Sequence, residues 1–136
     1  MYIQWKDEYC VGISRIDEQH FRLVEMLNEL YQKIGPETKP ADAWALLRQF
    51  NDYAETHFSA EERIARDSNV DIAALAAHKL EHESYSERMA SFRRSFEKND
   101  KRAPVQLMAF LSNWWLTHIL IRDMELGRLI REQEES

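Results

Sequence analysis

The chain has 136 residues, a formal net charge of −6, 44% hydrophobic residues and only three glycines and three prolines, a composition that favours one all-helical domain over a sheet protein rich in turns. The acidic balance without a basic cluster argues against nucleic-acid binding, and no apolar run approaches the roughly 18 residues of a membrane span. The single cysteine, Cys10, excludes an internal disulfide, and the first residues show no signal-peptide pattern, so we expect a cytoplasmic protein.

Residues 1–12 are expected to form an irregular arm whose apolar side chains pack on a helical bundle. Ser14, followed by the acidic Asp17 and Glu18, indicates a helix start, and Gly35 and Pro36 end that helix, so the first helix is expected over 14–34. Its apolar positions step by three and four residues, and His20 lies on the same stripe.

The second helix is expected over 40–66, because Pro40 suits the first turn of a helix. The inward stripe of this helix includes His57 and Glu61, which share one face and lie one turn apart. A buried imidazole or carboxylate costs free energy unless its polar atoms are bonded, so both side chains need partners. Asn69 or Asp71 is a candidate cap for the helix that follows.

The third helix is expected over 71–97, a stretch rich in Ala, Leu and Glu without Gly or Pro. His78 and His82 lie four residues apart on its inward face. The fourth helix is expected over 104–131, and its apolar stripe includes His118. Asp123 lies five residues later, about 140° round a regular helix, so periodicity alone predicts a solvated Asp123. Long helices with short connections predict a single all-α domain, residues 1–136, folded as an antiparallel up-down-up-down four-helix bundle with an N-terminal arm.

All five histidines lie on inward stripes, and all four helices contribute at least one. These residues are His20, His57, His78, His82 and His118. Five buried imidazoles beside Glu61 would destabilise a metal-free core by roughly several kcal/mol, whereas the same side chains would stabilise the fold when they bind metal. Five imidazoles with one or two carboxylates exceed the ligands of one tetrahedral zinc and suit two ions of higher coordination. Ligand type alone does not choose among iron, zinc and manganese.

These residues form a pattern that resembles the hemerythrin family of non-haem di-iron dioxygen binders. The pattern has one His on the first helix, H-x-x-x-E on the second, H-x-x-x-H on the third and H-x-x-x-x-D on the fourth. In this chain it is formed by His20, His57, Glu61, His78, His82, His118 and Asp123. Residues 16–20 and Trp114, four residues before His118, also resemble bacterial members.

The resemblance implies two iron ions, one coordinatively full and one with an open position, bridged by two carboxylates. His78, His82 and His118 would hold the first ion, and His20 and His57 the second, with Glu61 and Asp123 as bridges. Asp123 would then enter through a π-bulge or from the flank of the helix. The implied function is dioxygen carriage, storage or sensing rather than catalysis, with dioxygen bound end-on at the five-coordinate iron as hydroperoxide.

The chain departs from the family three residues before His118, where Trp115 replaces the usual Leu. Trp115 either fills the core or narrows a dioxygen pocket that Phe58 and Ile119 should also line, and its N–H could reach the bound ligand. The connection over residues 64–70 also lacks the Gly-Tyr-Pro-like turn of the family.

Three other functions compete with dioxygen binding. A di-iron protein for peroxide, redox or iron handling would fit if Trp115 limits stable dioxygen binding. A zinc hydrolase would use H-x-x-E-H over residues 78–82 with Glu81 as base, but leaves three histidines unexplained, and Glu81 is expected to face solvent. A ferritin-like oxidase would use E-x-x-H motifs, which this sequence lacks. A sensor would also need a protein partner, which the sequence does not identify.

Overall fold

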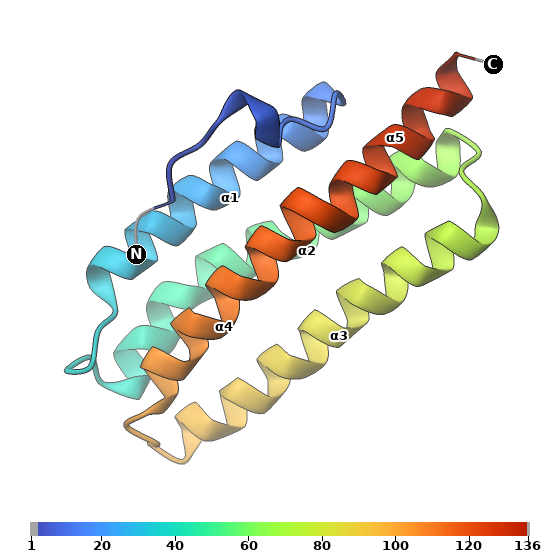
Figure 1. The fold of residues 1–136 in the computed structure, drawn as a ribbon. Helices are drawn as coiled ribbons and strands as arrows, with labels where there is room; N and C mark the ends of the chain where they lie inside the picture. The colour runs from blue at the N-terminus through green and yellow to red at the C-terminus, as the bar shows by residue number, and fades with distance from the viewer. Residues whose placement is uncertain (1–2, 136) are drawn as a thin grey trace.

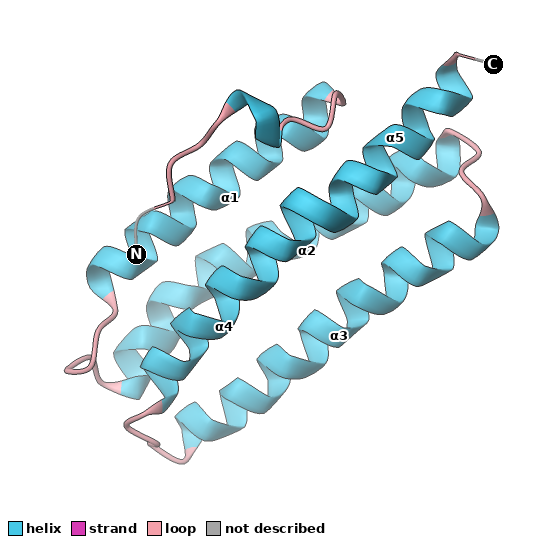
Figure 2. Cartoon of the chain, viewed as in Figure 1, coloured by secondary structure: helices cyan, strands magenta, loops and turns pink. Residues whose placement is uncertain are grey.

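The computed structural model describes residues 3–135, which contain helices and no β-strand (Figure 2). The first three long helices are α1 (Ser14–Lys33), α2 (Pro40–Asp67) and α3 (Ile72–Glu97). The fourth is continuous in direction but has three segments, α4 (Ala103–Thr117), the π-helical η2 (His118–Arg122) and α5 (Asp123–Glu134). A short 3-10 turn, η1 (Asp7–Tyr9), lies in the N-terminal arm.

Successive long helices run in opposite directions, and α1 and α3 each contact both α2 and α4 (Figure 1). The predicted all-α, up-down-up-down four-helix bundle is therefore confirmed. The first three helices begin and end within one residue of the ranges expected from the sequence, whereas the last one extends to residue 134. No helix in the described part of the chain is both long and apolar enough to cross a membrane, and the cytoplasmic location stays a prediction.

Two polar side chains shape the connection between α2 and α3. The Asp71 carboxylate accepts a hydrogen bond from Ala74 N at 3.3 Å, so Asp71, of the two candidates, caps α3. Asn69 instead ends α2 in the left-handed region, at a φ of 59°. Val70 N donates to Ala65 O at 3.1 Å, which satisfies a carbonyl of the last helical turn. A left-handed Asn thus makes the turn that the family motif would otherwise supply.

The N-terminal arm is held by Asp17 and by a close approach to α5. The Asp17 carboxylate accepts hydrogen bonds from Val11 N at 2.6 Å and Gly12 N at 3.2 Å, so it fixes the arm from the first turn of α1. Val11 lies against Gly127, where an added Cβ would be 2.8 Å from both the Cβ and the carbonyl oxygen of Val11. Residues 1–2 of the expected arm lie outside the described residues.

The core consists of two apolar clusters at opposite ends of the bundle. The larger one includes Leu23, Phe58 and Ile119 and extends toward the α1–α2 and α3–α4 connections. The smaller one includes Ile16 and Leu126 and lies near the α2–α3 connection. The positions between these residues on each helix hold the histidines and the two carboxylates. One polar layer therefore lies between two apolar clusters, and the packing of both clusters fixes the position of that layer along the bundle.

Candidate metal centre

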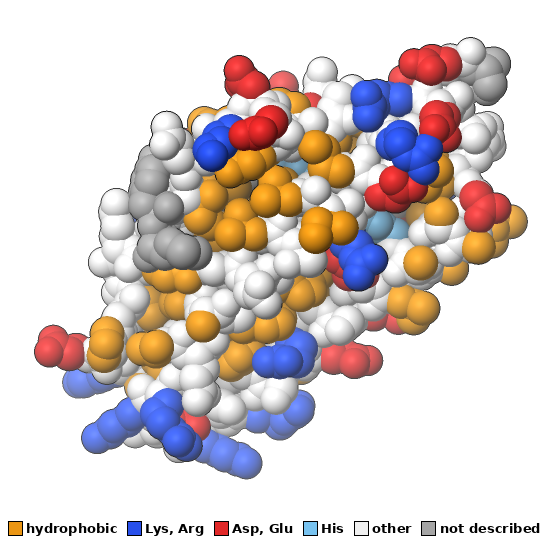
Figure 3. All heavy atoms as spheres, viewed as in Figure 1, with side chains coloured by type: hydrophobic (Ala, Val, Ile, Leu, Met, Phe, Trp, Pro, Cys, Tyr) orange, Lys and Arg blue, Asp and Glu red, His pale blue; other side chains and the backbone are white. Residues whose placement is uncertain are grey.

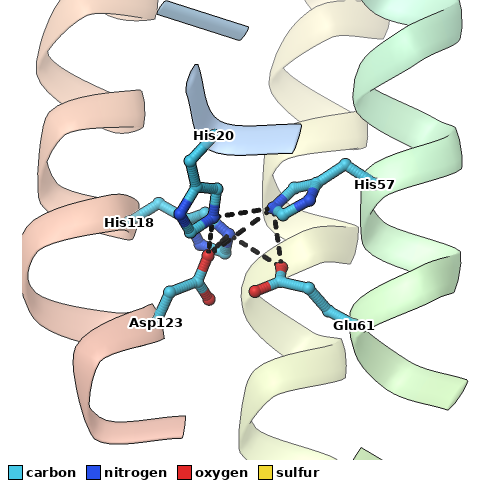
Figure 4. A group of neighbouring side chains, drawn as sticks. All are labelled: His20, His57, Glu61, His118 and Asp123. Carbon is cyan, nitrogen blue, oxygen red and sulfur yellow. Dashed lines mark hydrogen bonds and ion pairs between the residues drawn. The ribbon is translucent and has the colours of Figure 1, made fainter. Parts of the chain in front are cut away.

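All seven side chains that the sequence nominated as metal ligands meet in this layer. They are His20, His57, Glu61, His78, His82, His118 and Asp123, and none is more than 7% exposed. Figure 4 shows five of them converging from α1, α2 and the η2–α5 region. Each of the five imidazoles directs its Nε2 atom toward the carboxylates of Glu61 or Asp123.

The two carboxylates lie between the histidines. Asp123 Oδ2 is 2.6 Å from His20 Nε2 and 2.9 Å from His118 Nε2, while Asp123 Oδ1 is 2.9 Å from His78 Nε2. Glu61 Oε1 is 3.1 Å from the Nε2 atoms of both His57 and His118. Each carboxylate therefore contacts histidines from different helices, which is the position that a bridging ligand requires.

Short distances in this layer do not satisfy its polar atoms. Among the described residues, Nε2 of His78, Nε2 of His82, Oε2 of Glu61 and Oδ1 of Asp123 have no hydrogen-bond partner. His78 Nε2 and Asp123 Oδ1 approach within 2.9 Å, yet their orientation is wrong for a hydrogen bond. Buried polar atoms almost always have a partner, and lone pairs that converge on one region are satisfied by a cation. The donor set and its unpaired atoms therefore fit metal ions.

The ligand atoms fall into two overlapping groups, within each of which every atom lies within 4.8 Å of the others. The first group contains His20, His57, Glu61, His118 and Asp123, and the second contains Glu61, His78, His82 and His118. The division separates His20 and His57 from His78 and His82, with Glu61 shared, as the resemblance implies. Two residues differ from that expectation in this grouping, because His118 falls in both groups and Asp123, expected as a bridge, falls only in the first. Which ion each residue holds stays a prediction.

Periodicity alone was wrong about Asp123, which is only 1% exposed. Residues 118–122 form a π-helix, which adds a residue to one turn of the last long helix and so lowers the rotation per residue there. Asp123, five residues after His118, is thereby brought to the same face, because the π repeat joins residues i and i+5. The His118 Nε2–Asp123 Oδ2 distance of 2.9 Å results from this local distortion, one of the two routes that the resemblance required.

Three polar side chains, none of them expected in this role from the sequence, orient three of the histidines from behind. Gln19 Oε1 lies 2.8 Å from His57 Nδ1, Glu62 Oε2 lies 2.9 Å from His82 Nδ1, and Glu81 Oε1 lies 3.2 Å from His118 Nδ1. Such partners fix the ring orientation and raise the basicity of a ligand histidine. Each of the three directly neighbours a predicted ligand in sequence but contacts a histidine on another helix.

The expectation that Glu81 faces solvent was therefore wrong. Its side chain is only 20% exposed, and its second oxygen lies 3.2 Å from Arg122 Nε. With one oxygen on His118 and the other on Arg122, Glu81 is committed to the histidine cluster. This arrangement argues against the zinc hydrolase, which needs Glu81 as a free base toward a substrate.

Burial and the neighbouring charges shift the pKa values of the groups in this layer in opposite directions. Burial alone would lower the pKa of His118, but the carboxylates of Asp123 and Glu61 outweigh it and hold that pKa well above its ordinary value. Burial alone would likewise raise the pKa of Glu61, but His57 and His118 hold it well below its ordinary value. At His20, burial prevails and lowers the pKa. The pKa of Asp123 is lowered as well, so both carboxylates favour the ionised form that a bridging metal ligand requires.

The three predicted pocket residues, Phe58, Trp115 and Ile119, are all buried beside the histidines. The Phe58 ring stacks on His82, with centroids 4.0 Å apart, and lies nearly parallel to Trp115 at 5.4 Å. Trp115 in turn lies 5.5 Å from His118 and 6.0 Å from His57 between ring centroids. The indole N–H has no hydrogen-bond partner among the described residues, although it lies near the Tyr85 hydroxyl.

Comparisons with known proteins agree with this geometry. Residues 11–130 match a family model described as the Hemerythrin HHE cation binding domain. A bacteriohemerythrin of Clostridium acetobutylicum is 31% identical over 125 residues, which cover 89% of this chain and 95% of that protein. A bacteriohemerythrin of Stenotrophomonas maltophilia is 32% identical over 85% of this chain and 72% of its own length. A hemerythrin-like protein of Naegleria gruberi is 26% identical over 89% of this chain and 87% of its own length.

Proposed function

Since the chain belongs to the hemerythrin family, we propose that it binds dioxygen at two iron ions in the middle of the bundle, as a carrier, store or sensor with no more than a weak peroxide- or oxidase-type side activity. The observation that carries this proposal is the convergence of five imidazoles and two carboxylates in a layer where several buried ligand atoms lack any other partner. The relatives named bacteriohemerythrin support the same function.

The iron pair would supply two electrons to dioxygen and an open position next to His20 and His57. The end-on mode expected from the resemblance stays a prediction. The residues of the chain supply the surroundings, beginning with the burial of His20 and His57, which are 0% exposed and keep water from that side of the pair. Phe58 and Trp115 pack against His57 and close that side of the site with apolar surface. Water exclusion protects a bound oxygen ligand from protons and stray reductants.

The test is an absorption spectrum of iron-loaded protein, recorded first without air and then after aeration, together with metal analysis. We expect two irons per chain and a visible ligand-to-iron band that appears on aeration and disappears under vacuum. One zinc per chain would favour the hydrolase instead. Protein that is oxidised at once in air, with no reversible band, would contradict dioxygen carriage.

One observation favours a second candidate, a di-iron protein for peroxide, redox or iron handling. Trp115 is 2% exposed and lies beside Phe58, His57 and His118, where a smaller residue would leave room for a ligand. If the Trp115 indole leaves too little space, the site would hold dioxygen only weakly, and peroxide, redox or iron chemistry would be its function instead. Rapid oxidation in air, combined with two irons per chain, would support this candidate over carriage.

A further inference from the structure

Three of the predicted ligands lie out of reach of external electron donors. His20, His57 and His118 are each 0% exposed, so no donor in solution can touch them. A side chain that contacts both the centre and the surface can carry electrons between them. Trp114 contacts the centre directly, because its ring stacks on the His118 imidazole with centroids 4.7 Å apart and an angle of 15° between the planes.

The same indole reaches the surface. Trp114 is half-buried and lines a groove of about 890 Å³ between α3 and the last long helix. The groove is also lined by His78, which is 7% exposed, and by the Glu81–Arg122 pair. Figure 3 shows this face, where histidine atoms are visible between basic and acidic side chains. One aromatic ring therefore joins a predicted metal ligand to an open groove.

Two other oxidisable rings lie beside Trp114 but are less suited to exchange electrons with a donor at the surface. Tyr85 and Trp115 lie 4.6 Å and 5.0 Å from it between ring centroids, and both are buried. A phenol that loses an electron also releases its proton, and the Tyr85 hydroxyl has no partner among the described residues to accept one. Burial also raises the pKa of Tyr85. Trp114, in contrast, is half-buried and lines a groove that is open to solvent.

We propose that Trp114 relays electrons from phenolic donors in this groove to the metal pair and so gives the protein a peroxidase-type activity. The activity rests on the proposed function only in requiring the bound iron pair. One hydrogen peroxide accepts two electrons and two protons, its O–O bond breaks, and two waters form. Two phenols each lose one electron and the hydroxyl proton and become phenoxyl radicals. Each electron passes through the Trp114 indole, which gives one to the centre and regains one from the phenol.

The experiment follows oxidation of 2-methoxyphenol by hydrogen peroxide with the iron-loaded protein and three variants. Trp114→Phe keeps a ring on His118 but removes the oxidisable indole, so we expect the rate to fall about tenfold or more. Trp114→Tyr keeps an oxidisable ring and should retain a substantial part of the rate. Trp44→Phe is the matched control, because Trp44 is partly buried against Phe96, at the end of the larger apolar cluster, and should leave the rate unchanged.

A second readout does not depend on turnover. Peroxide added without phenol should oxidise Trp114 itself, and mass spectrometry of peptides should find added oxygen at that residue in the wild type and in Trp44→Phe. Equal rates in wild type and Trp114→Phe, no turnover in the wild type, or oxidation that avoids Trp114 would each overturn the relay. A reversible dioxygen band in the same samples would leave the proposed function standing. Trp114-dependent turnover without that band would overturn dioxygen binding and support the relay.

Discussion

Replacing Trp115 with Leu tests whether this indole limits the dioxygen site or only fills the core. The substitution removes roughly 60 Å³ from a fully packed position, and at ~24 cal/mol per Å³ the cavity alone costs about 1.5 kcal/mol. Burial of Leu also gains less free energy than burial of the larger indole ring, and this difference adds about 1 kcal/mol to the loss. Removing an indole N–H that is buried without a partner returns about 1 kcal/mol. We therefore expect the free energy of unfolding to fall by only about 1–2 kcal/mol.

The functional effect should have the opposite sign. Trp115 lies 5.5 Å from His118 and 6.0 Å from His57 between ring centroids, so a Leu side chain opens space beside both histidines. We expect the dioxygen adduct to live longer in Trp115→Leu than in the wild type, measured by the decay of the visible band after aeration. Urea unfolding of the same sample gives the stability, and Trp44→Leu controls for loss of a Trp elsewhere. An unchanged lifetime at the expected stability would show that Trp115 is only a core residue.

Three further predictions address the orientation of His118, the arm and the metal. Glu81→Gln removes the negative charge behind His118, so metal affinity, measured by competition with a chelator, should fall by roughly 10–100-fold. The control is Glu83→Gln at an exposed position, which should leave the metal affinity unchanged. Equal affinities in the two variants would show that Glu81 does not act on the metal centre. Gly127→Ala forces a Cβ within 2.8 Å of Val11, so the free energy of unfolding, measured with urea, should fall by about 1–3 kcal/mol. The control is Gly35→Ala, because Gly35 has open space around it. Similar stabilities in the two variants would mean that the arm shifts to accept the added methyl group. Exhaustive chelation should lower the thermal midpoint, because the buried ligand atoms lose their counter-ion, and an unaltered midpoint in a protein that binds no transition ion would refute the metal centre.

Helical periodicity was sufficient for the bundle and for most of the candidate site. A repeat of 3.6 residues places residues three and four apart on one face, so His78 and His82, or His57 and Glu61, can be assigned to the core from spacing alone. Helix ends also depend on local chemistry, and Asp71 was identified as a candidate cap because a carboxylate satisfies free N–H groups in the first turn. Interactions within one helix are encoded by neighbours in the chain, which is why these predictions hold.

Two features depended on the tertiary structure. Asp123 enters the metal layer because residues 118–122 adopt π-helical hydrogen bonding, a register that a hydrophobic stripe does not specify. Gln19, Glu62 and Glu81 each neighbour a predicted ligand in sequence, yet each contacts a histidine of a different helix. Those pairings are set by how the helices rotate and slide against one another, and that relation exists only once the bundle has packed.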